Sequence, residues 1–378
     1  MTPPKSAKHE NYQKIFKWAL SLFLLFLCTA TGLFSAENKE KAEKPKTSGF
    51  IALPIIYYTP ETRWALGAGS MYYFRPRGEG LEHRPSSLGI TGFYTQNKQY
   101  EISISPDLYL RGEKHRIYSN VKLQKSVYNF YGIGSNNPAG RSEVYTTHTV
   151  SYFLRAQKKI WSNLNIAVQH EYRYNNIIQT EKDGLLEPQK IPGSEVYHIS
   201  GFSLHANWDS RNNVYYPYQG SWCEASVFIF RKIIGSNYDF SRYNINLRKY
   251  ISVLPRHILA VQELLNFING TAPFQILSTL GGQDFMRGYY QGRFRENHSI
   301  LLQMEYRMPV WKRFGAVGFA SAGKVVHKLS DFTFKNLKYA YGFGIRFAID
   351  PKERLNIRLD FGFTKDSSGV YFTVMEAF

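Results

Sequence analysis

Apolar and polar residues alternate along most of this chain with a period of two. In the segment 354–363, five apolar residues alternate with Asn356, Arg358, Asp360 and Gly362. Successive side chains of a strand point to opposite faces, so this pattern predicts β-strands with one apolar and one polar face. No comparable helical period follows the first forty-eight residues. The pattern therefore predicts an all-β protein.

Glycine, proline, asparagine and aspartate break this pattern into about sixteen segments. An even number of strands is typical of single-chain outer-membrane barrels, which have short turns on the periplasmic side and long loops outside. The predicted connections follow this rule in part, because those at 76–86 and 209–220 are long for turns. We predict a transmembrane antiparallel β-barrel over 49–378, with strands near 51–59, 64–75, 87–97, 99–110, 115–126, 144–157, 162–177, 196–208, 221–232, 238–251, 256–268, 299–310, 315–323, 338–349, 354–364 and 369–378.

Composition agrees with a barrel. Aromatic residues make up 16% of the chain, including 28 Tyr and 27 Phe, and barrels carry aromatic girdles at both membrane interfaces. The mean hydropathy of −0.36 argues against a bundle of membrane-spanning helices. A barrel hides its membrane signal because every second residue is polar.

The N-terminal region predicts export. Lysines precede an apolar run from Trp18 to Ala30, and small residues ending at Ala36 follow it. This order is typical of a signal peptide, so we expect a cleaved signal peptide at 1–36 and a short charged linker at 37–48. An uncleaved single-pass helix is the alternative, but the run is shorter than the ~20 residues of a span. The expected location is the outer membrane.

The chain is strongly basic. Its formal charge is +18, of which +3 lies in the leader (four Lys minus Glu10), leaving +15. Such a surplus predicts a basic lumen or basic turns that meet anionic lipid, including lipopolysaccharide. The charges are spread along the chain without a basic block, so a nucleic-acid partner is not expected. Cys223 is the only cysteine after the leader, which excludes an intramolecular disulfide.

Motifs for enzymatic chemistry are scarce. The sequence has no phosphate-binding loop, no metal-type histidine spacing and no Gly-x-Ser-x-Gly elbow, so neither a cofactor nor a metal is expected. His198 and Ser200 share one strand face and resemble the His-x-Ser of outer-membrane phospholipases. A motif of two residues is weak, and a pair of polar residues at headgroup level is the simpler interpretation. We therefore predict that the protein is not an enzyme.

The most informative motif is a glycine-rich loop that carries Arg287, followed by Gly288 and Tyr289. An arginine on a long loop of a barrel is expected to enter the polar lumen and pair with a carboxylate. Glu305 lies in a polar row with Gln303 and Arg307, so it is a candidate partner. Pairing of Glu305 with Arg307 is the alternative.

Three blocks resemble the bacterial surface antigen family, which contains the BamA/TamA-like outer-membrane insertases. Met286-Arg287-Gly288-Tyr289 resembles the motif at the tip of the family's inward-folded loop. A second block, 303–309 followed by 318–323, resembles the two strands whose carboxylates hold this loop in the family. The resemblance implies that Glu305 and the strand ending at Gly323 hold the loop here. The family has an aspartate where this chain has Ser321, so one carboxylate partner is expected for the loop arginine instead of two.

A third block, from Asp209 through Arg211 and Pro217 to Gly220, resembles the family's turn between two barrel strands. The predicted last strand carries Phe372 and ends at Phe378, which resembles the signal by which barrels are handed to an assembly machine. No periplasmic or hydrolase domain fits before residue 49, so the resemblance implies a barrel-only member.

The resemblance implies a monomeric barrel that acts in outer-membrane protein assembly or transport, with client barrel proteins or a periplasmic partner. Two other functions stay open at this point. The basic charge fits a passive or loop-gated pore for anions or lipid headgroups. The exposed loops at 127–143 and 178–195 fit a surface antigen that binds partners.

Overall fold

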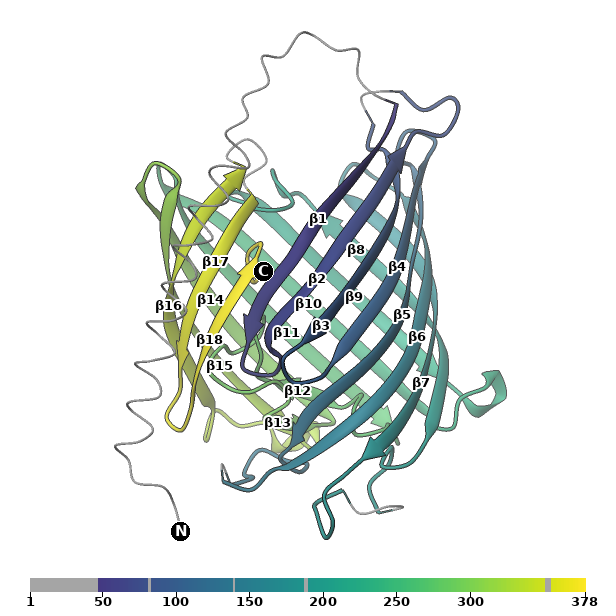
Figure 1. The fold of residues 1–378 in the computed structure, drawn as a ribbon, viewed down its shortest axis with the longest axis vertical. Helices are drawn as coiled ribbons and strands as arrows, with labels where there is room; N and C mark the ends of the chain where they lie inside the picture. The colour runs from purple at the N-terminus through teal and green to yellow at the C-terminus, as the bar shows by residue number, and fades with distance from the viewer. Residues whose placement is uncertain (1–46, 81–82, 139, 187–189, 351–354) are drawn as a thin grey trace.

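The computed structural model describes residues 47–80, 83–138, 140–186, 190–350 and 355–378, and its main feature is a closed antiparallel barrel (Figure 1). The expected signal peptide and most of the linker lie outside the described residues. The barrel strands follow one another in chain order, except that β14 follows β11 directly. None of the helices in the described ranges has the length and apolar character needed to cross a membrane.

Sixteen strands form the wall, as the alternation predicted. Their bounds are β1 Ser48–Thr59, β2 Arg63–Phe74, β3 Ser86–Thr95, β4 Tyr100–Leu110, β5 His115–Phe130, β6 Glu143–Lys159, β7 Leu164–Gln179, β8 Tyr197–Asp209, β9 Gly220–Phe230, β10 Phe240–Leu254, β11 His257–Gly270, β14 His298–Trp311, β15 Phe314–Val326, β16 Lys338–Asp350, β17 Leu355–Phe363 and β18 Ser368–Val374. We call the barrel end with the connections 75–85, 111–114 and 160–163 the turn side, and the opposite end the loop side.

The two faces of the wall follow the sequence pattern. On β14, Leu302 and Met304 are each 44% exposed on the outer face, whereas Gln303 and Glu305 are buried in the lumen. The same alternation recurs on neighbouring strands, because register partners in a sheet share a face. Apolar rows therefore face lipid, and polar rows line the interior.

The seam between β1 and β18 is short. β18 matches β17 at successive positions from Ser368 to Val374, but it matches β1 only where Tyr58 faces Phe372. β1 is paired with β2 along its whole length, from Ser48 to Thr59. Figure 1 shows the yellow β18 beside the dark β1 near the C-terminal end of β1. Most of this edge of β1 thus has no partner strand among the described residues.

The long connection 271–297 folds into the lumen. It carries two short strands that the alternation did not predict, β12 Ser278–Leu280 and β13 Phe294–Glu296, paired with each other. On the loop side, an apolar cluster joins this connection to the wall and to another loop; it includes Phe130, Tyr145, Leu186 and Phe274. The loop side of the lumen is therefore filled by side chains.

The prediction for the last strand was wrong at its end. The strand was expected to run to Phe378, but β18 stops at Val374. Met375 adopts a positive φ of 72°, which turns the chain. Glu376 then pairs with Arg346 at 2.7 Å, and Phe378 packs against Tyr250 in the lumen. The last four residues alternate as a strand would, but the buried ion pair of Glu376 holds them in the lumen instead.

Candidate functional site

The tip of the inward loop lies against the lumen wall near the seam. Arg287 is 2% exposed and pairs with Glu305 of β14 and Asp360 of β17. Its guanidinium group also lies 3.7 Å from the ring centroid of Phe319 on β15. An arginine can hold two carboxylates and stack on an aromatic ring because its guanidinium is planar and carries five donors. One side chain thereby fixes the loop to three strands.

The second carboxylate is Asp360, which corrects the expectation of a single partner. Ser321 does not reach Arg287; its hydroxyl donates to the carbonyl oxygen of Ala340 at 3.3 Å. The polar row of the predicted strand 354–364 already contained Asp360. Sequence reasoning missed it because the pairing of β17 beside the loop depends on how the barrel closes.

Glu305 pairs with both Arg287 and Arg307. The two partners considered as alternatives from the sequence are therefore bound at the same time. Arg307 Nε donates to Glu305 Oε2 at 2.9 Å. Arg346 pairs with Asp360 at 2.5 Å and with Glu376 at 2.7 Å. The described part of the cluster contains four arginines and four carboxylates in ion pairs: Arg287, Arg307, Arg346, Arg358, Asp284, Glu305, Asp360 and Glu376. The side chains of this cluster are at most 4% exposed, except that of Asp284, which is 45% exposed. Charges are balanced, as buried ion pairs require.

Glycines let the loop approach the wall. Gly288 has a φ of 114°, a left-handed conformation that a residue with a Cβ rarely adopts. A Cβ on Gly362 of β17 would lie 2.5 Å from the carbonyl carbon of Arg287. Gly323 serves the same purpose on β15, because a Cβ there would lie 3.0 Å from the sulfur of Met286. These positions require glycine because backbone meets backbone or a buried side chain.

Backbone and hydroxyl contacts complete the attachment to the β17–β18 side. The Gly288 N–H donates to the Tyr371 hydroxyl at 2.9 Å, and Ser367 Oγ donates to the Gly288 carbonyl at 2.7 Å. The Tyr289 ring packs edge-on against Phe294 at 5.2 Å. The loop tip is therefore held by neutral contacts as well as by charge.

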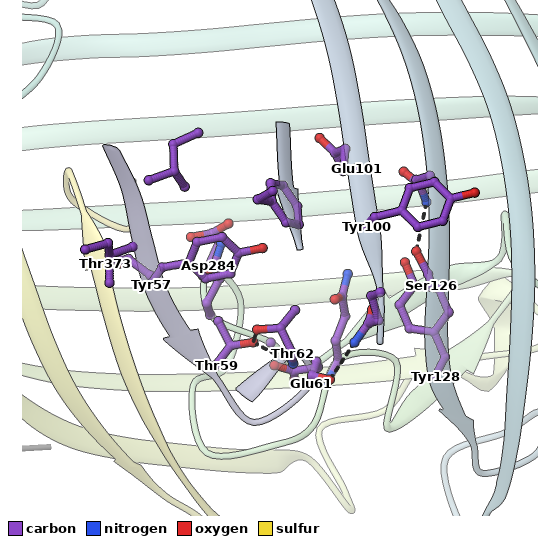
Figure 2. Close-up of a pocket in the computed structure, with 18 of the residues that line it drawn as sticks. Tyr57, Thr59, Glu61, Thr62, Tyr100, Glu101, Ser126, Tyr128, Asp284 and Thr373 are labelled. Atoms are coloured by element: carbon purple, nitrogen blue, oxygen red, sulfur yellow. Dashed lines mark hydrogen bonds between the residues drawn. The ribbon is translucent and has the colours of Figure 1, made fainter. Parts of the chain in front are cut away.

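The loop also contacts the other side of the seam. The Gln291 N–H donates to Glu61 Oε1 at 2.7 Å, and Glu61 belongs to the β1–β2 turn. A lumen cavity of about 540 Å³ lies between this turn, the inner face of β1 and the loop residues 281–285. Figure 2 shows Tyr57, Glu61 and Asp284 around this cavity, with Thr373 of β18 at its edge. The loop thus bridges β1 and β18 from inside.

The turn between β8 and β9 has the geometry that its residue types predict. Asp209 accepts two bonds from the Arg211 guanidinium, at 2.9 and 2.8 Å. Burial alone lowers the pKa of Arg211, but the hydrogen bonds and charge of Asp209 raise it overall. Pro217 is buried, and Gly220 has a φ of 102° beside the Ser210 carbonyl. This turn lies near the arginine cluster, because Arg307 faces the Tyr216 ring at 5.7 Å.

The two predicted exit-signal phenylalanines occupy different places. Phe372 lies on the outer face of the seam, 6.3 Å from the Trp64 ring centroid. Phe378 is buried in the lumen, where its carbonyl oxygen accepts from Arg307 at 2.8 Å. The structure therefore does not place the two on one strand.

His198 does not bond Ser200. The partner of Ser200 is His170 of the neighbouring strand, whose Nε2 lies 3.1 Å from Ser200 Oγ, and Tyr152 contacts the other ring nitrogen at 3.2 Å. Strands β6, β7 and β8 are each paired on both sides, so their backbone donors are engaged in the sheet and offer no oxyanion site.

One comparison identifies the family of this chain, and another identifies solved structures that share its fold. A family model described as the Omp85 superfamily domain matches residues 81–378. Among solved structures, BamA from Haemophilus ducreyi lacking POTRA domains 1–3 aligns with a TM-score of 0.63 at 14% identity, covering 88% of this chain and 71% of that one. A search of curated proteins gave no match.

Two further structures share the fold. CdiB from Acinetobacter baumannii has a TM-score of 0.57 at 11% identity, and CdiB from Escherichia coli has one of 0.59 at 12% identity. Each alignment covers 88% of this chain, which spans 60% and 63% of the two CdiB chains. The closed sixteen-stranded barrel, the inward arginine loop and the family match over most of the sequence lead to one conclusion: this chain is a member of the Omp85 superfamily, whose barrel fold belongs to the bacterial outer membrane.

Proposed function

We propose that this protein acts in outer-membrane protein assembly or transport, by opening the seam between β1 and β18 to an incoming strand. The observation that carries the proposal is the single register match at Tyr58 and Phe372. An unpaired strand edge presents backbone donors and acceptors that another strand can bind. A seam with one match can open at little cost, whereas a fully paired wall cannot.

The edge strand itself suits this role. Phe50 on the outer face and Leu53 on the lumen face are 67% and 54% exposed. β1 is therefore apolar on both faces, unlike strands whose inner row is polar. Pro54 lies in the middle of β1, and proline is tolerated in sheets mainly at edges, where its missing N–H needs no partner. Such a strand can contact lipid and an apolar client side chain at the same time.

The loop tip supports a coupling between the lumen and the seam. It contacts the β1–β2 turn through Glu61 and the β17–β18 hairpin through Tyr371 and Ser367. A docked loop therefore holds both sides of the seam from inside. We infer that release of Arg287 loosens the seam, so the loop-to-lumen lock regulates opening.

The proposed partners are client barrel proteins, a periplasmic partner and outer-membrane lipids including lipopolysaccharide. The turn side faces the periplasm in this proposal, because outer-membrane barrels place short turns there. The chain reaches the outer membrane through a cleaved signal peptide and acts without catalysis, as a monomeric barrel.

A disulfide across the seam tests the proposal. Register partners have Cβ atoms about 5 Å apart, so Tyr58→Cys with Phe372→Cys, in a Cys223→Ser background, closes the seam when oxidised. The matched control joins Val227 to Tyr243, which are partners in the fully paired β9–β10 wall. In the native host, folded outer-membrane proteins are quantified by heat-modifiable migration and mass spectrometry, with depletion of the protein as the reference.

The proposal expects the oxidised seam variant to reproduce the depletion phenotype, with selective loss of one or several folded barrels. Reduction restores them, and the control disulfide has no effect. If depletion leaves every folded barrel unchanged, the assembly role is wrong. If depletion removes barrels but the locked seam does not, the role stands without the seam mechanism.

A further inference from the structure

The outer face of the barrel has a hollow near the turn side. It has a volume of about 590 Å³ and lies across strands β4 to β7. Ala156 lies at its centre, between its register partners Ile117 and Val168. Val168 is 58% exposed on the outer face. A small residue between two branched ones leaves a groove in the lipid-facing wall.

Two cations and a histidine line the turn-side end of this groove. Arg111, His115 and Lys158 line it together with apolar residues. His115 and Lys158 are register partners, so they share the outer face. In the described part of the chain, no ion pair involves Arg111 or Lys158. Two cations without a protein partner thus lie where an apolar groove ends.

His115 contributes its imidazole ring to the lining of the groove. Its Nδ1 is covered by protein and has no hydrogen-bond partner among the described residues. Only the accessible part of this ring can therefore meet a ligand in the groove, and the positive charge comes from Arg111 and Lys158.

The turn that carries Arg111 is held firmly. Glu79 accepts from the backbone N–H groups of Arg111 and Gly112, and Glu113 pairs with Arg84 at 3.8 Å. The two nearby carboxylates are therefore engaged elsewhere and do not neutralise the cations of the groove. The backbone of this rim is preorganised for a ligand.

We propose that this groove binds an anionic phospholipid of the leaflet on the turn side, with one acyl chain against Ile117, Ala156 and Val168. The phosphate lies between Arg111, His115 and Lys158. Membrane proteins attract anionic headgroups with cations placed at the interface. The groove faces lipid, so the occupant comes from the membrane. This site does not depend on opening of the seam, and it specifies a binding place for one class of the proposed lipid partners.

Trp161 provides a reporter, because it follows the groove residue Ile160 and is 68% exposed. The full-length barrel is reconstituted in phosphatidylcholine vesicles that contain a minor fraction of brominated phosphatidylglycerol or brominated phosphatidylcholine. Subtracting the signal of Trp161→Phe isolates the quenching at this position. The site predicts stronger quenching by the anionic lipid at equal bromine content.

Two variants separate the headgroup from the acyl chain. Arg111→Gln with Lys158→Gln is expected to lower the preference for phosphatidylglycerol roughly thirtyfold, the loss expected for two interfacial cations. Ala156→Leu fills the groove and is expected to reduce quenching by both lipids. The matched control, Lys249→Gln with Arg256→Gln, neutralises an outer-face cation of β10 and its neighbouring turn residue and is expected to change nothing.

Heat-modifiable migration verifies that each variant is folded. Equal quenching by the two brominated lipids in the unmodified protein would overturn the site. So would an equal loss in the control pair, because the preference would then reflect the net charge of the barrel. Loss of preference confined to the Arg111 and Lys158 pair, with loss of quenching by both lipids in Ala156→Leu, supports it.

Discussion

Replacement of Arg287 by alanine is expected to undock the inward loop without unfolding the barrel. The change removes one positive charge from a cluster in which four arginines balance four carboxylates. Glu305 keeps Arg307, and Asp360 keeps Arg346. Breaking a buried ion pair costs about 3–5 kcal/mol. We expect a cost near 3 kcal/mol here, because Arg307 and Arg346 still neutralise the two carboxylates.

A loss of about 3 kcal/mol raises the undocked population roughly a hundredfold, since 1.4 kcal/mol is a factor of ten. Met286 is fully buried in the docked loop, so Met286→Cys in a Cys223→Ser background reports undocking through its maleimide labelling rate. We expect the rate to rise by about two orders of magnitude in Arg287→Ala. Heat-modifiable migration provides the control for barrel folding.

A compensating change tests the electrostatic reasoning. Arg287→Ala combined with Asp360→Asn restores the charge balance of the cluster, so the labelling rate is expected to fall back part of the way. This coupling is measurable as a double-mutant cycle. Unchanged labelling in Arg287→Ala would refute the account of the loop as held by buried charge. So would additivity, in which the free-energy change of the double variant equals the sum of the changes in Arg287→Ala and Asp360→Asn.

Three further changes test neighbouring contacts with the same labelling assay and with urea unfolding in detergent. Gly362→Ala is expected to undock the loop because the new Cβ would meet the loop backbone, whereas Gly318→Ala, which faces open space, leaves labelling unchanged; equal effects would contradict the steric argument. Tyr371→Phe removes the acceptor of the Gly288 N–H and is expected to favour undocking by about 1–2 kcal/mol, a claim that unchanged labelling would rule out. Ser321→Ala is expected to change unfolding by no more than about 1 kcal/mol, and a larger loss would show that the hydroxyl supports the loop.

Local chemistry predicted the wall of this barrel because a strand repeats every two residues. The row of Gln303, Glu305 and Arg307 was assigned to the lumen from alternation alone, and the structure places it there. The turn from Asp209 to Gly220 was equally readable, since its geometry depends on residues close in sequence. For the same reason, the barrel strands were predicted with ends mostly within a few residues.

Only the tertiary structure decided which charges meet. Asp360 lies 73 positions after Arg287 in the sequence, yet barrel closure brings β17 beside the loop tip. The inward path of Met375–Phe378, the pairing of Ser200 with His170 and the single match of β1 with β18 likewise depend on register and closure. Alternation determines which face a side chain occupies, because that depends on its own strand. Its contact partner depends on where distant strands end, which no local pattern encodes.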